Sequence, residues 1–132
     1  MNTDNGSEEF ELIHAYTRKQ ALEDGVLVDL GALASEAGFR WPVAVTRTVY
    51  DGILVPPKAV EQEGQSFTGR AWDLLTVLRL EARRTGGGRE VRFAPLFVSR
   101  PGEPPKAVPL KAVSGPGDDG EPVITVMLPD ED

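Results

Sequence analysis

The sequence predicts an α+β fold in which short N-terminal helices precede one long amphipathic helix packed on a C-terminal three-stranded antiparallel sheet. Two observations carry this prediction. Between Thr68 and Arg84, apolar residues recur at three- and four-residue steps, the spacing of one face of a helix. Three extended runs follow at residues 89–100, 106–113 and 122–128, joined by Gly- and Pro-rich connections that favour antiparallel neighbours.

The first half of the chain predicts short elements. Thr17 is a suitable N-cap for a helix over residues 18–24, with Gln20 at the capping-box spacing and Gly25 as the stop. The run of β-branched or apolar residues at 26–30 indicates a short strand or an extended packing segment.

A second brief helix is expected over residues 31–37, closed by a glycine. Pro42 disfavours helix at the residue before it, and residues 43–52 are then expected to form a further helix. Residues 55–65 contain two adjacent prolines and are expected to be an irregular connector.

The long helix is the clearest element. Its inward stripe is predicted to consist of small and aliphatic residues, namely Ala71, Leu74, Leu75, Leu78 and Ala82. Polar residues are predicted to lie largely opposite, among them Arg70, Asp73, Thr76, Arg83 and Arg84. Three glycines at 86–88 end the helix.

Length and composition limit the classes of protein to which the chain can belong. The 132 residues suggest a disordered segment at 1–9 and a single α+β domain at 10–132 with an acidic C-terminal end. The chain has no cysteine, which excludes disulfides, thiolate metal sites and cysteine nucleophiles. Neither a signal peptide nor an apolar run of about 20 residues is present, so a soluble, cytoplasmic protein without membrane partners is expected.

The net charge of −7 is unevenly distributed. Residues 1–9 carry three acidic side chains and residues 117–132 carry six, with no basic residue in either segment. Residues 10–116 hold 14 basic and 12 acidic side chains, a net of +2. The acidity is therefore terminal, and the overall negative charge argues against general affinity for nucleic acid.

The acidic C-terminal end is the first candidate site. Its six carboxylates are predicted to contact a basic partner, or else to serve solubility alone: Asp118, Asp119, Glu121, Asp130, Glu131 and Asp132. A calcium loop needs regularly spaced oxygen ligands, a spacing that residues 116–122 lack. Asp119-Gly120 instead favours a hairpin turn, so neither a metal nor a cofactor is expected.

The second candidate site is basic. Four arginines near the end of the long helix and the following strand would suit phosphate or carboxylate if they converged: Arg83, Arg84, Arg89 and Arg92. The alternative interpretation is that cations near a helix C-terminus are stabilised by the helix dipole, and this interpretation is favoured.

No catalytic constellation emerges from the sequence. His14 is the only histidine, and without cysteines it cannot complete a usual zinc set. A structural role for His14 is favoured over a weaker hypothesis in which it serves a hydrolase or transferase. An enzyme is not expected.

The chain resembles an uncharacterised family of short bacterial proteins encountered on plasmids, integrative elements and phages. The residues that carry the resemblance are Phe10–Leu30, Glu36–Phe39, Pro42–Arg47 and the closing segment Gly115–Asp132. The resemblance brings no catalytic residues. It implies an accessory protein of mobile elements, a class that includes inhibitors of host defence such as anti-CRISPR proteins.

The resulting expectation is a small non-enzymatic accessory protein that binds and inhibits a host protein complex through its acidic end. The alternative is a nucleic-acid-binding accessory protein that uses the four arginines.

Overall fold

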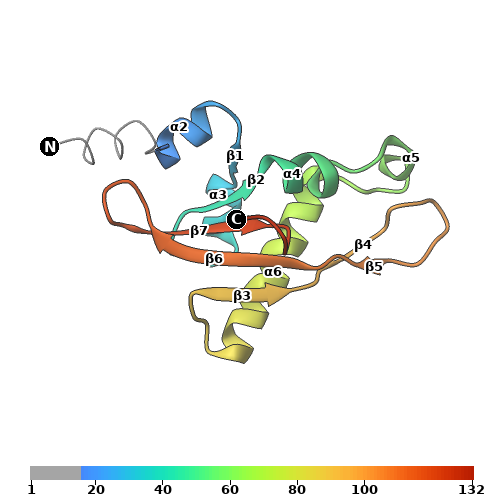
Figure 1. Cartoon of the computed structure of the whole chain (residues 1–132). Helices are drawn as coiled ribbons and strands as arrows, with labels where there is room; N and C mark the ends of the chain where they lie inside the picture. The colour runs from blue at the N-terminus through green and yellow to red at the C-terminus, as the bar shows by residue number, and fades with distance from the viewer. Residues whose placement is uncertain (1–15) are drawn as a thin grey trace, which may run out of the picture.

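The computed structural model describes residues 16–132 (Figure 1). The segment 1–9 and His14 lie outside the described residues. The helices are α2 (Arg18–Glu23), α3 (Gly31–Glu36), α4 (Arg47–Val49), the π-helix η1 (Tyr50–Leu54), α5 (Lys58–Glu61) and α6 (Phe67–Thr85). The strands are β1 (Leu27–Asp29), β2 (Val43–Thr46), β3 (Glu90–Phe93), β4 (Leu96–Phe97), β5 (Lys106–Ala107), β6 (Leu110–Pro116) and β7 (Pro122–Met127).

The main sheet is mixed, with the strand order β1-β2-β7-β6-β3. The predicted antiparallel meander is confirmed in β3, β6 and β7. The three-stranded prediction was too small, because β2 pairs with β7 in parallel and β1 adds to β2 in antiparallel fashion. The last strand thus lies in the middle of a five-stranded sheet.

The predicted helix over residues 43–52 is wrong in its first four residues and correct in the rest. Residues 43–46 are strand β2, and only then does the chain turn helical through α4 and η1. Val43, Ala44 and Val45 are all buried, because β2 lies between two strands and is covered on both faces. A strand buried on both faces reads as a continuous apolar run, which periodicity cannot separate from a helix segment.

Prolines divide the predicted strands at residues 89–100 and 106–113 into two strands each. Pro95 separates β3 from β4, and Pro109 separates β5 from β6, because proline has no N–H to donate to a sheet ladder. The short strands β4 and β5 pair with each other in a separate two-stranded ribbon. The predicted connector 55–65 contains the short helix α5.

Helix α6 matches its prediction closely. The Ser66 hydroxyl accepts the Gly69 N–H at 3.0 Å as N-cap, and Gly86, at φ 81°, ends the helix in the left-handed conformation. The apolar stripe of the helix is buried against one face of the sheet. On this face, a row of apolar side chains in register crosses all five strands. Its members are Val28, Val45, Val126, Ala112 and Val91.

The prediction that Arg70 lies on the polar face of the helix is wrong. Its side chain is buried, with only 3% of the residue exposed. Its guanidinium donates to the carbonyl oxygens of Ile53 (2.8 Å) and Val98, and Nε donates to Gln65 Oε1 at 3.3 Å. It also stacks on the Phe97 ring at 5.2 Å. Position 70 precedes Leu74 by four residues and so lies on the buried stripe, where carbonyl partners replace solvent.

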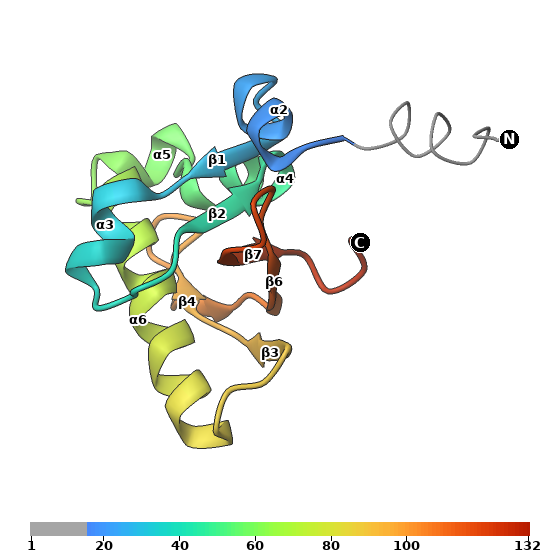
Figure 2. The ribbon, with the colours of Figure 1, turned by 90° about the vertical axis from the view of Figure 1, so that its left-hand side faces the viewer.

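The opposite face of the sheet carries α2 and the C-terminal end (Figure 2). Leu27, Thr46 and Met127 lie on this face, one residue along from the buried valines of their strands. Among residues 16–132, no helix is long and apolar enough to cross a membrane.

Candidate functional site: an acidic groove

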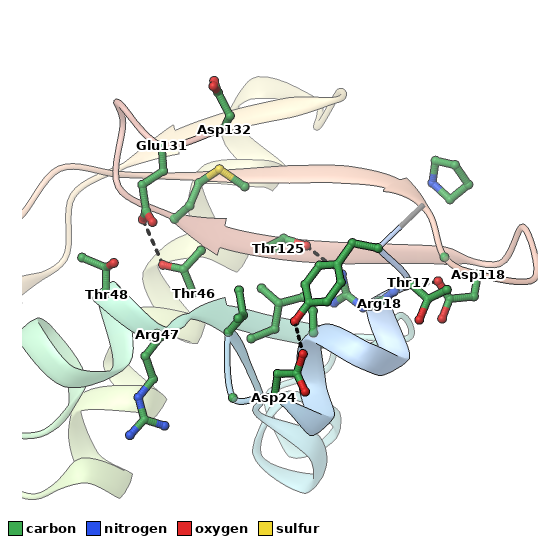
Figure 3. Close-up of a pocket in the computed structure, with 18 residues that line it drawn as sticks. Thr17, Arg18, Asp24, Thr46, Arg47, Thr48, Asp118, Thr125, Glu131 and Asp132 are labelled. Carbon is green, nitrogen blue, oxygen red and sulfur yellow. Dashed lines mark hydrogen bonds between the residues drawn. The ribbon is translucent and has the colours of Figure 1, made fainter. Parts of the chain in front are cut away.

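An open groove of about 910 Å³ lies on the sheet face opposite α6 (Figure 3). Its floor is formed by Leu27, Thr46, Thr125 and Met127 from strands β1, β2 and β7. Helix α2, the start of α4, the hairpin between β6 and β7, and the C-terminal residues form its walls. The groove therefore joins segments from both ends of the described chain.

The wall formed by α2 begins with the predicted capping box. The Thr17 hydroxyl accepts the Gln20 N–H at 3.0 Å, and Gln20 Oε1 accepts the Thr17 N–H at 3.0 Å. Asp118 completes the helix start from the hairpin, since its carboxylate accepts the N–H groups of Arg18 (2.8 Å) and Lys19 (2.9 Å). The exposed N–H groups of the first turn are thus satisfied by a distant loop.

Arg18 fastens α2 to the central strand. Its guanidinium donates to Thr125 Oγ1 at 2.8 Å and to the Ile124 carbonyl oxygen at 3.0 Å. Partial burial lowers the pKa of Arg18, and the carboxylates of Asp29, Asp118 and Glu121 oppose that shift. The guanidinium keeps its charge and forms part of the groove lining.

The C-terminal residues are held against the floor by Glu131. Its Oε1 atom accepts the Thr46 hydroxyl at 2.9 Å and the Leu128 N–H at 2.8 Å. Asp132 follows directly and also lines the groove. Two of the predicted acidic residues are thereby placed beside the strand floor.

The lining of the groove is net negative. Its four carboxylates, on Asp24, Asp118, Glu131 and Asp132, outnumber the guanidiniums of Arg18 and Arg47 by two. Arg47 already pairs with Asp51 at 3.0 Å and lies over the Tyr50 ring.

Two hydrogen-bonding arrangements reinforce the ordinary charge states of an acid and a phenol in the groove. Hydrogen bonds from the N–H groups of Lys19 and Arg18 lower the pKa of Asp118, so its carboxylate stays ionised. The Tyr16 hydroxyl donates to Asp24 at 2.5 Å, and this bond raises the pKa of the phenol, which stays neutral. The arrangement suits a cationic ligand.

The six predicted acidic residues do not form one patch. Asp118, Glu131 and Asp132 line the groove, whereas Asp119, Glu121 and Asp130 do not. The carboxylate of Glu121 turns back to accept the Asp119 N–H at 3.1 Å, which stabilises the predicted hairpin turn. Asp130 is exposed.

The candidate sites predicted from the sequence did not include Arg18, Asp24 and Thr46, which line the groove. Their only sequence signal was a polar residue within an otherwise apolar stretch. That signal does not tell a groove residue from a surface residue.

The predicted arginine cluster is divided. Arg84 is paired with Glu81 on α6, and Arg92 is paired with Glu90 at 2.8 Å on β3. Arg92 alternates with the buried Val91 and Phe93, so it points from the sheet face away from α6. Arg83 and Arg89 are exposed and have no ion pair within residues 16–132.

The described part of the chain holds no cluster of three or more His, Asp or Glu side chains that could bind a metal ion. Comparisons of the chain with protein-family models, with curated proteins and with solved structures found no match.

Proposed function

We propose that this chain is a small non-enzymatic binding protein whose acidic groove takes a basic segment of a partner protein. The observation that carries the proposal is that Asp24, Asp118, Glu131 and Asp132 all line one groove with an apolar and hydroxyl-bearing floor. Carboxylates can pair with lysine or arginine side chains, and the floor can contact their aliphatic stems.

The partner is proposed to be a cytoplasmic host protein complex that the chain inhibits, in the manner of an anti-CRISPR protein from a mobile element. The supporting observations are the small size, the acidic ends and the resemblance of both ends of the chain to the mobile-element family. Inhibition would follow if the groove occupied basic residues that the complex needs for nucleic acid.

A matched pair of charge reversals tests the groove. Asp132 lines it and Asp130 does not, so Asp132→Lys and Asp130→Lys make the same change in charge two residues apart. Titration with a short synthetic peptide of alternating arginine and alanine measures the effect. We expect Asp132→Lys to weaken binding by about three- to tenfold, and Asp130→Lys to weaken it less.

Equal losses in both variants would contradict the groove, because they would report net charge alone. The biological partner is then sought by affinity capture from the native host with the wild type and Asp132→Lys in parallel. A complex retained by the wild type and lost by Asp132→Lys supports the proposal, provided that the wild type also inhibits its activity. Equal capture by both proteins contradicts it.

The nucleic-acid alternative stays a prediction, with less support because Arg84 and Arg92 are already paired with glutamates. It requires binding to duplex or single-stranded nucleic acid at low salt, with an affinity that falls steeply as salt rises. Absence of such binding would remove it.

A further inference from the structure

A second hollow lies at the C-terminal end of α6, on the other side of the sheet from the groove. This Trp41 pocket has a volume of about 440 Å³. Its lining residues come from α6, from the three glycines that follow it (the glycine loop, residues 86–88), from the sheet and from the segment before β2. They are Leu78, Ala82, Gly86, Gly87, Gly88, Val91, Ala112, Ser114, Ile124, Phe39 and Trp41. None of these lining residues lines the groove.

The lining of the Trp41 pocket contains no charged side chain among the described residues, although 27% of the chain is charged. Its walls are aromatic and aliphatic, and Trp41 remains 46% exposed. A large aromatic side chain that is half in water gains from a partner that covers it.

The glycine loop forms one wall of the pocket. Gly86, Gly87 and Gly88 have φ values of 81°, 79° and 116°, which side-chain-bearing residues rarely adopt. A Cβ atom at any of the three would meet no atom within 4 Å, so this wall faces free space and presents bare backbone.

Ser114 supplies the pocket's single side-chain hydroxyl. The Oγ atom lies 3.4 Å from the carbonyl oxygens of Gly88 and Arg89, at the long end of hydrogen-bond distances. The hydroxyl therefore has capacity for a shorter bond to a ligand in the pocket.

We infer that the Trp41 pocket binds a small, uncharged, flat aromatic molecule, with Trp41 against its ring and Ser114 as its polar anchor. The volume falls in the range of roughly 300–1,000 Å³ typical of small-molecule sites, which are mostly apolar with a few placed polar groups. An ionised ligand is disfavoured because the lining offers no opposite charge. This inference does not depend on the acidic groove.

The probe for this inference is N-phenyl-1-naphthylamine, whose fluorescence rises in apolar surroundings. The full chain is expected to bind it saturably with one-to-one stoichiometry. Its sulfonated analogue, 1-anilinonaphthalene-8-sulfonate, has the same rings and a negative charge. It is expected to bind at least about tenfold more weakly because no cation in the lining meets the sulfonate.

Two matched pairs of variants locate the bound probe. Ala82→Leu fills the pocket with a good helix former and should weaken binding by at least about tenfold, whereas Ala82→Ser keeps the volume and the affinity. Trp41→Ala removes one wall and should weaken binding, whereas Trp72→Ala, in the other tryptophan, should not. Circular dichroism verifies the fold of each variant.

Absence of saturable binding to the wild type would overturn the inference. Unchanged affinity in Ala82→Leu, or equal affinities in Trp41→Ala and Trp72→Ala, would also overturn it. If Ala82→Leu does not fold, the tryptophan pair decides alone.

Discussion

The carboxylate of Asp118 accepts the backbone N–H of Arg18 at 2.8 Å, across 100 positions of the sequence. A second bond, from the Lys19 N–H at 2.9 Å, makes the same carboxylate a cap for α2. The hairpin between β6 and β7 thus supports the helix that forms one wall of the groove. Any partner of the groove meets a wall made by both segments.

This cap predicts a pH-dependent contribution to stability. The pKa of Asp118 is lower in the folded state than the usual value of about 3.9. The stabilising contribution is therefore fully present above that value and is lost as the pH falls through the folded pKa. Asp118→Asn should lower the melting temperature by a few degrees at neutral pH, and the difference from wild type should shrink in acid.

Melting curves between neutral and strongly acidic pH measure this effect. Asp119→Asn is the matched control, since Asp119 is adjacent and its side chain accepts no hydrogen bond within residues 16–132. A difference between wild type and Asp118→Asn that stays constant down to the lowest pH would contradict the capping role.

Arg70 should stabilise the fold through its carbonyl partners rather than through an ion pair. Arg70→Ala leaves the carbonyl oxygens of Ile53 and Val98 without this donor and opens a cavity, at a cost of about 2–4 kcal/mol. Arg70→Met fills the space without donors and should fall between alanine and wild type. Chemical denaturation measures both free energies of unfolding.

The control for Arg70 is Arg83→Ala, an exposed arginine on the same helix, expected to change stability by less than about 0.5 kcal/mol. If Arg70→Met proves as stable as wild type, packing rather than hydrogen bonding explains the burial of Arg70.

Glu131 should hold the C-terminal residues at the groove. Glu131→Ala removes the acceptor of the Thr46 hydroxyl and of the Leu128 N–H, so exchange of the Leu128 amide should accelerate by about tenfold. Hydrogen exchange followed by NMR measures that amide, with Asp130→Ala as the control. Equal protection in the two variants would show that Glu131 does not hold this end.

The two faces of α6 should differ sharply in their tolerance of truncation. Leu74 is fully buried, and Leu74→Ala should cost about 2–5 kcal/mol through lost contacts and a cavity. Leu80 is 59% exposed, so Leu80→Ala should cost less than about 1 kcal/mol. Similar losses, measured by chemical denaturation, would show that the helix is oriented differently.

Local signals predicted the elements that depend on local contacts. The capping box of Thr17 and Gln20 and the apolar stripe of α6 act within a few residues, and both were predicted correctly. Residues 43–46 were mistaken for helix because their strand state depends on β7, which is distant in the sequence. Pairing across such separations leaves no periodic mark in a run buried on both faces.

The candidate site was predicted only in part for the same reason. The acidic character of residues 117–132 is visible in the sequence, and the structure places three of its six carboxylates, on Asp118, Glu131 and Asp132, in the groove lining. Nothing local indicates that Asp118 caps a helix near the other end of the chain, or that Glu131 accepts a hydrogen bond from Thr46. The separation of Arg84 from Arg92 likewise depends on the tertiary fold.

The central position of β7 constrains the order in which the sheet can form. During synthesis β1 and β2 emerge first, and β3 and β6 later, but the strand that joins the two pairs is translated last. Nascent chains that stop before residue 122 lack the strand that connects the pair β1–β2 with the pair β3–β6. The five-stranded sheet therefore closes only after β7 has left the ribosome, later than the other four strands.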